Sequence, residues 1–223
     1  MIYCRHCSGR KLPISYCLKE DFSTLPVYSM RMYFITSGYI LLLLNGERCY
    51  VGSNALLCLQ PSDTLHILAQ SQLKAQSLCF APEFLNVSLK EAFVLSPDFD
   101  IQRRNMDYPR LNMFLNRNLY YNGVLPLLPQ ASQYVHQSLM SILYQLDKQP
   151  DPRWSCRARA LLFRLLDMIE FESNRLMNPD SIHHPLVGEV LEYIHLHIGE
   201  ELSVPLLCKL FHTNHTTLNQ KFR

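Results

Sequence analysis

Hydrophobic residues gather in short blocks separated by turn residues between Leu25 and Phe84. Blocks of this length, rich in branched and aromatic residues, are typical of β-strands. Asn45 and Gly46 lie between two blocks and supply the positive φ that a tight hairpin turn needs. The pattern predicts an all-β barrel or sandwich built from short strands. The predicted strands are 28–35, 39–44, 48–51, 55–59, 66–68 and 75–80.

The hydrophobic period changes to that of helices after Pro129. Apolar residues spaced by three or four positions predict a helix that starts at Pro129 and is broken at 151–152. The same spacing predicts a second helix over residues 153–175. Residues 95–112 are polar and contain prolines, so we expect a loop there, and residues 113–128 are expected to complete the sheet. The fold class is therefore α+β, with a β-domain followed by helices.

The last part of the chain carries apolar stripes over 186–198, 202–211 and 215–223. Ser203 and Asn214 each precede a stripe and are predicted to be N-caps. A short helix, a turn of about four residues and another short helix form the helix-turn-helix pattern. The sequence therefore predicts such a motif near its C-terminal end.

Apolar anchors define which side of this motif faces outward. Leu207, Leu210, Leu218 and Phe222 are expected to point into the core. The polar side chains left outside can pair with base edges or phosphates of double-stranded DNA. The predicted DNA-binding residues are His215, Thr216, Asn219, Gln220, Lys221 and Arg223.

The segment 202–223 resembles the first helix-turn-helix of the AraC/XylS family of bacterial transcription regulators. The family's run is Leu-Ser, then Leu-Ala, then Ser and a helix with Leu and Phe four apart before a basic residue. Cys208 stands where Ala is usual, Thr213 where an apolar residue is usual and Asn214 where Ser is common. The resemblance implies that base contacts are made by Thr216, Asn219 and Gln220.

The order of the predicted strands, with 59–66 as the most telling piece, resembles the cupin-like N-terminal domain of the same family. The resemblance implies a cupin-like effector-binding or dimerisation domain over 1–128. It also implies a helical linker that can supply a dimer interface over 129–178, and a DNA-binding part over 186–223. Family members carry two helix-turn-helix motifs, whereas this sequence contains the first, so tight specific binding is not expected of it.

The resemblance implies a cytoplasmic bacterial regulator that binds DNA as a homodimer. Its further expected partners are a small-molecule or protein effector and RNA polymerase. An effector would shift how two reading helices are spaced on tandem half-sites. A chain that dimerises without binding DNA, and so blocks full-length partners, is a further interpretation. The candidate effector contacts, which are equally typical of strand residues satisfied by their neighbours, are Arg31, Tyr33, Tyr50 and His66.

Charge and hydropathy narrow the class of protein further. A net charge of +2 and a pI near 8.1 do not indicate a nonspecific polyanion binder. The N-terminal residues lack the apolar core of a signal peptide. The longest apolar run, 39–44, is far too short to span a bilayer. We therefore expect a cytoplasmic protein without a membrane partner.

A cupin-fold small-molecule binder or metal-dependent enzyme, with C-terminal helices that only pack, is the alternative. Catalytic cupins bring several metal ligands together, but only His66 stands in the corresponding region. Cys4 and Cys7 have zinc-like spacing with His6 and Cys17 nearby, yet no second Cys pair follows. A catalytic triad, a phosphate loop and a dinucleotide motif are also absent from the sequence. We expect no enzymatic activity, no metal and no cofactor.

Overall fold

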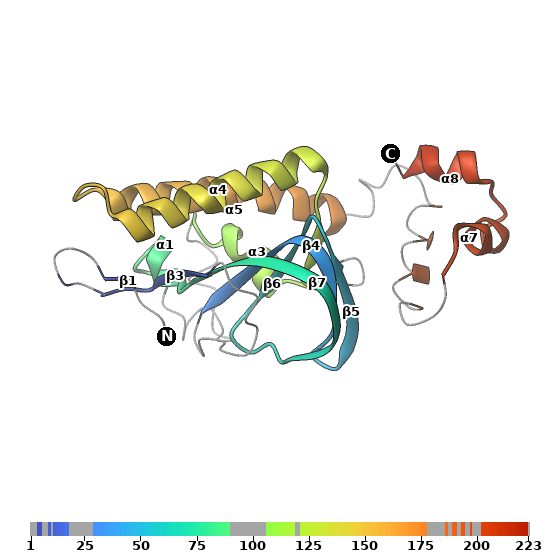
Figure 1. The fold of residues 1–223 in the computed structure, drawn as a ribbon, viewed down its shortest axis with the longest axis horizontal. Helices are drawn as coiled ribbons and strands as arrows, with labels where there is room; N and C mark the ends of the chain where they lie inside the picture. The colour runs from blue at the N-terminus through green and yellow to red at the C-terminus, as the bar shows by residue number, and fades with distance from the viewer. Residues whose placement is uncertain are drawn as a thin grey trace.

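The computed structural model describes residues 4–5, 9, 11–17, 29–89, 106–118, 121–177, 186, 189–190, 193–194, 197 and 202–222. Within these residues the fold is α+β, with a curved antiparallel sheet and helices that cover one of its faces (Figure 1). The sheet order is β3-β7-β4-β6-β8, and β5 also pairs with β4. Its strands are β3 (Ile14–Cys17), β4 (Met30–Leu44), β5 (Glu47–Gly52), β6 (Ala55–Leu59), β7 (Leu65–Phe80) and β8 (Val124–Pro126). β1 (Cys4–Arg5) and β2 (Lys11–Leu12) pair with each other in a separate antiparallel ribbon.

Strands β4 and β7 run through positions where the sequence predicted breaks. β4 continues across residues 36–38, and β7 joins the two strands predicted at 66–68 and 75–80. The prediction of separate strands is wrong because β4 and β7 pair along almost their whole lengths. The pairing shifts its register on both sides of Ser37, but the hydrogen-bonded ladder between β4 and β7 continues past this point.

The turn predictions in this region are confirmed. Asn45 and Gly46 have φ values of 54° and 88°, and β5 pairs back onto β4 from Leu44↔Glu47 to Tyr39↔Gly52. At the next predicted turn, the Asp63 N–H donates to the Gln60 carbonyl oxygen at 3.1 Å. Local turn chemistry therefore places these strands as the sequence indicates.

The two faces of the sheet carry different apolar clusters. The helix-side cluster includes Met32 and Phe34 of β4 together with residues of the covering helices. The inner cluster includes Tyr33 and Ile35 and, after the irregularity in β4, Ile40 among other strand residues. Alternate residues of a strand point to opposite faces, so the irregularity explains why inner positions change from odd to even numbers.

The covering helices are α4 (Pro129–Lys148) and α5 (Trp154–Met177), which lie side by side across the sheet (Figure 1). Their predicted positions are confirmed. Pro129 occupies the first turn of α4, and the helix ends where Gln149 adopts a left-handed φ of 44°. Leu139 of α4 and Leu162 of α5 are buried in the helix-side cluster. These helices therefore complete the core with one face of the sheet.

The segment before α4 departs from its prediction. In the described part of 95–128, Pro109–Leu111 form a 3₁₀ helix (η2) and Asn112–Leu115 form α3, whereas only β8 joins the sheet. Met113 and Phe114 are buried in the helix-side cluster, which favours a compact turn over a strand. A further short helix, α1 (Pro82–Leu85), follows β7. None of the helices described is long and apolar enough to cross a bilayer.

Candidate nucleic-acid interface

Two short helices follow one another near the C-terminal end: α7 (Val204–Leu210) and α8 (His215–Lys221). Both predicted N-caps are confirmed. The Leu206 N–H donates to Ser203 Oγ at 3.3 Å, and the Thr217 N–H donates to Asn214 Oδ1 at 2.8 Å. These bonds satisfy backbone donors that have no partner within the helix, so they fix where each helix begins.

The turn between α7 and α8 has a defined geometry. His212 adopts a left-handed φ of 47°. The Thr213 N–H donates to the Cys208 carbonyl oxygen at 2.9 Å, which is the long bond of a Schellman motif. The turn therefore sets the direction in which α8 leaves α7.

A small apolar cluster holds the two helices. Val190, Leu207 and Leu218 are buried in it, and the rings of Tyr193 and Phe211 meet edge to face with their centroids 5.7 Å apart. The residues described within the predicted helix 186–198 are consistent with a helix, since the His197 N–H donates to the Tyr193 carbonyl oxygen at 3.1 Å. Leu218 therefore orients α8 by facing this cluster.

Two predicted core residues are exposed instead. Leu210 is 44% exposed, and Phe222 is 43% exposed. Phe211, four positions after Leu207, takes the inward place predicted for Leu210, because residues four apart share a helix face. Phe222, the C-cap residue of α8, is exposed although it lies four positions after Leu218, whereas Phe211, the C-cap residue of α7, packs against the cluster.

The outer face of α8 presents polar side chains to solvent. Asn219 Nδ2 lies 3.3 Å from His215 Nδ1, as expected for residues four apart on a helix. Between Leu202 and Phe222 the sequence has no acidic residue, and α7 and α8 each carry a lysine in the last turn. Arg223 lies outside the described residues. The exposed members of the predicted set are His215, Thr216, Asn219, Gln220 and Lys221.

The four predicted effector contacts are not brought together. Arg31 and Tyr33 are buried on the inner side of β4. Tyr50 is 48% exposed and stacks on Tyr39 with ring centroids 5.5 Å apart. His66 is exposed opposite Leu43. The structure therefore divides this set between a buried pair and two surface residues.

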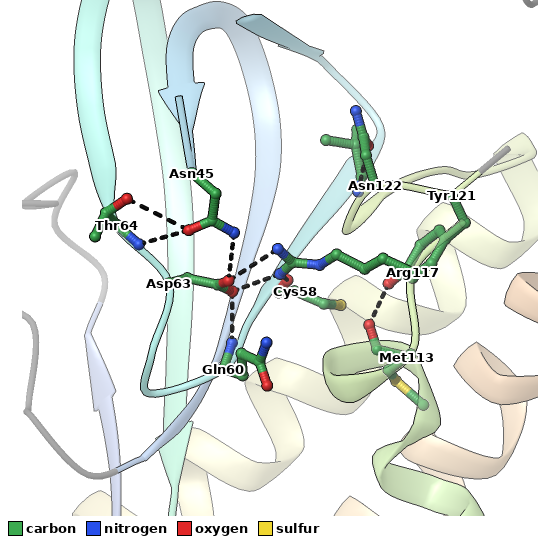
Figure 2. A network of polar contacts seen from close by, with 10 residues as sticks. Asn45, Cys58, Gln60, Asp63, Thr64, Met113, Arg117, Tyr121 and Asn122 are labelled. Atoms are coloured by element: carbon green, nitrogen blue, oxygen red, sulfur yellow. Dashed lines mark hydrogen bonds and ion pairs between the residues drawn. The ribbon is translucent and has the colours of Figure 1, made fainter. Parts of the chain in front are cut away.

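A polar network that the sequence did not reveal links the strand turns to the segment before β8 (Figure 2). Asp63 Oδ1 accepts from Asn45 Nδ2 at 2.8 Å and from Arg117 Nη1 at 2.9 Å. The second carboxylate oxygen of Asp63 accepts from the Gln60 N–H at 2.8 Å and from Arg117 Nη2. Arg117 Nη2 also donates to the Cys58 carbonyl oxygen at 3.1 Å.

This network is a structural clamp. The side chain of Asp63 is 1% exposed and that of Arg117 is 18% exposed, so the ion pair is largely shielded from water. Beside it, burial raises the pKa of the Cys58 thiol to about 12, and the Tyr121 hydroxyl donates to the Met113 carbonyl oxygen at 2.5 Å. Sequence reasoning missed the clamp because Asp63 and Arg117 are 54 positions apart.

Candidate metal ligands are not grouped together in the part of the chain that is described. Within those residues, groups of three or more His, Cys, Asp or Glu side chains placed to hold a metal ion are absent. Cys7 of the considered Cys4–Cys7 pair and the nearby His6 lie outside that part. The expectation of a chain without metal, cofactor or catalysis stays a prediction.

Comparison with known proteins gives structural matches only. No family model and no curated protein matches the sequence. The structure is similar to the AraC-like transcriptional activator CuxR, with a TM-score of 0.41 and 15% identity over 95% of this chain and 68% of that chain. It is also similar to an apo variant of ToxT from Vibrio cholerae strain SCE256, with a TM-score of 0.40 and 11% identity over 93% of this chain and 73% of that chain. Wild-type ToxT of that strain with bound unsaturated fatty acid gives a TM-score of 0.31 and 13% identity over 94% of this chain and 71% of that chain.

Of these similar structures, CuxR is described as an AraC-like transcriptional activator. All three TM-scores are below 0.5 and all three identities are below 25%, so the likeness carries no weight for individual residues or for DNA binding. The geometry of α7 and α8 is therefore the basis of the function proposed below.

Proposed function

We propose that this chain is a sequence-specific DNA-binding transcription regulator of the AraC type. In this proposal α7 and α8 form a helix-turn-helix, and α8 enters the major groove. Residues 1–128 form a cupin-like sensory or dimerisation domain, and α4 and α5 belong to a linker that can contribute to a homodimer. The regulator acts in the cytoplasm of a bacterium, with RNA polymerase as a further partner.

The observation that carries the proposal is the division of α8 into two faces. Leu218 faces the apolar cluster, whereas Thr216, Asn219 and Gln220 are exposed. A recognition helix needs such an arrangement, because its buried side fixes its orientation while its outer side meets the base edges. The capped N-terminus of α8 and the Schellman turn hold that orientation.

The chemistry of the exposed residues suits DNA recognition. Asn and Gln amides can form paired hydrogen bonds with the N6 and N7 edge of adenine. Thr216 can bond a base or contact a thymine methyl group. Lys209 and Lys221 can neutralise phosphates without opposition from a neighbouring acidic side chain in 202–222.

The small number of basic residues predicts a modest electrostatic contribution. Each neutralised phosphate makes the slope of log affinity against log salt concentration more negative by about 0.9. A subunit using Lys209 and Lys221 would contribute a slope of about −2. A homodimer that places two copies of α8 about 34 Å apart, one turn of the duplex, would double the contacts.

Selection of duplexes from a random pool by the full chain tests the proposal. The enriched duplex is then titrated in a fluorescence anisotropy assay against the wild-type protein and the variant Asn219→Ala. The variant is expected to bind about 5- to 150-fold more weakly, because loss of a base contact costs roughly 1–3 kcal/mol. Its circular dichroism spectrum should match that of the wild type.

The matched control is Gln133→Ala, which removes an exposed amide from α4, away from the proposed interface. This control should leave the affinity unchanged. If the full chain enriches no sequence, or if Asn219→Ala and Gln133→Ala bind equally well, the proposal is wrong. A stable dimer that enriches no duplex would instead support the interpretation of a protein that blocks its partners.

A further inference from the structure

Arg31 occupies an unusual place for a charged residue. It lies within β4, opposite Leu59 of β6 on one side and Cys79 of β7 on the other. Only 3% of the residue is exposed. Tyr33, two positions further along the strand, belongs to the inner cluster, so Arg31 points to the same inner side of the sheet. A guanidinium group is therefore buried at the edge of an apolar interior.

The guanidinium of Arg31 has unpaired donors. Its Nε and Nη1 atoms are buried and have no hydrogen-bond acceptor in the described residues. Two other arginines have carboxylate partners: Arg117 pairs with Asp63, and Arg110 pairs with Asp107 and Asp167. An arginine side chain keeps its charge at any physiological pH, and a buried charge is strongly unfavourable unless an opposite charge meets it. Among the described residues, Arg31 thus has no carboxylate partner.

The side chains opposite Arg31 and next to it on this face are neutral, and those on β3 and β7 are also short. Cys79 lies opposite Arg31, Ser15 lies opposite Cys79, and Ser77 lies opposite Tyr33. Directly opposed residues of antiparallel strands share a face, so these groups lie on the same side of the sheet as Arg31. Ser77 is itself buried. The hydroxyl groups of Ser15 and Ser77 can donate hydrogen bonds but carry no negative charge.

The Cys79 thiol does not supply the counter-charge. Burial raises the pKa of Cys79 to about 11, against the opposing effects of the Arg31 charge and of a hydrogen bond with Ser15. At neutral pH the group is therefore a thiol, not a thiolate. Within the described residues, an internal partner for Arg31 is absent.

We propose that Arg31 binds the anionic group of a small ligand, a carboxylate or a phosphate, on the inner side of the sheet. The planar donors of a guanidinium fit two oxygens of such a group, and the hydroxyls of Ser15 and Ser77 add further donors. The inference deepens the proposed function, on which it rests for the role of the anion as effector. Anion binding itself can be measured without DNA.

Thermal unfolding of the full chain with acetate or with inorganic phosphate tests the inference, with chloride holding the ionic strength constant. Binding to the folded state is expected to raise the Tm by about 3 °C or more at ten times the Kd of the anion. The arm with the larger response identifies the carboxylate or the phosphate as the preferred chemistry. Calorimetric titration with the same anion should give the same Kd.

The variant Arg31→Met keeps the approximate length of the side chain and removes its charge. This variant should lose the anion response and should unfold at a higher temperature than the wild type without added anion, because the unpaired buried charge is gone. Arg31→Lys, which keeps the charge but loses the paired donors, should bind the anion about tenfold more weakly. It also serves as the test if Arg31→Met does not fold.

Arg48→Met is the matched control, because Arg48 is exposed on the neighbouring strand β5. It should respond to the anion as the wild type does. The inference is overturned if the wild type shows no anion-specific rise in Tm, or if the Arg31 variants respond as strongly as Arg48→Met.

The two proposals can fail separately. Asn219→Ala should keep the full anion response, because Asn219 lies on α8 and not on the sheet. Loss of DNA selection with a normal anion response contradicts only the regulator. Normal DNA selection without an anion response contradicts only the ligand site.

Discussion

Replacing Asp63 with alanine is expected to lower the free energy of unfolding by about 3 kcal/mol, the lower part of the range for breaking a buried ion pair. The lower part applies because the Arg117 side chain keeps 18% exposure and can gain some hydration. The change leaves the Arg117 guanidinium, the Asn45 amide and the Gln60 N–H without their shared acceptor. Equilibrium unfolding in urea measures the loss.

The double variant Asp63→Ala with Arg117→Met isolates the coupling. It should lose less stability than the sum of the two single variants, because neither then leaves a buried charge behind. Asp147→Ala removes a carboxylate from an exposed ion pair with Lys148, so it should leave the urea concentration at the unfolding midpoint unchanged. An Asp63→Ala midpoint equal to that of Asp147→Ala would show that the network is no clamp.

Gly38→Ala is expected to cost about 2–5 kcal/mol of the free energy of unfolding, the sum of two effects. The φ of Gly38 is +74°, in the left-handed region that L-residues disfavour. A Cβ at this position would lie 2.3 Å from the carbonyl oxygen of Ser71, which belongs to the paired strand β7. The backbone at the centre of the sheet would have to move.

Gly46→Ala separates the two effects. Gly46 has a φ of +88°, but a Cβ there would meet nothing within 4 Å. Its substitution should therefore cost only the conformational part, about 1–2 kcal/mol. Urea unfolding of both variants measures the difference, and equal losses would contradict the account of close approach between β4 and β7.

Sequence patterns predicted the features that depend on neighbouring residues. The hairpin at Asn45 and Gly46, the start of α4 at Pro129 and the N-caps Ser203 and Asn214 all follow from chemistry within a few positions. Amphipathic spacing likewise placed α4 and α5, because helix packing buries every third or fourth residue.

Features that depend on distant partners were not predictable from the sequence. The continuity of β4 through Gly38 requires knowledge of its pairing with β7. The pairing of Asp63 with Arg117 joins two loops of the fold, and neither residue has a local signal. The burial of Arg31 likewise appears only when β6 and β7 flank it.

Leu210 and Phe222 were predicted to be buried but are exposed, so fewer residues than predicted hold the two helices to the apolar cluster. α8 is oriented by Leu218 alone among its own residues, since Phe222 is exposed. The face opposite Leu218 remains the polar one, so exposure of Thr216, Asn219 and Gln220 does not depend on Phe222. The proposed reading face therefore persists although one predicted anchor is lost.

Repeating the selection from random duplexes with the Gln220→Ala variant tests most directly whether α8 reads bases. Loss of one base-edge contact should relax the preference at one position of the enriched site and leave the other positions unchanged. Gln133→Ala should enrich the wild-type site. An identical enriched site for the wild type and for Gln220→Ala, together with an identical one for Asn219→Ala, would contradict the account.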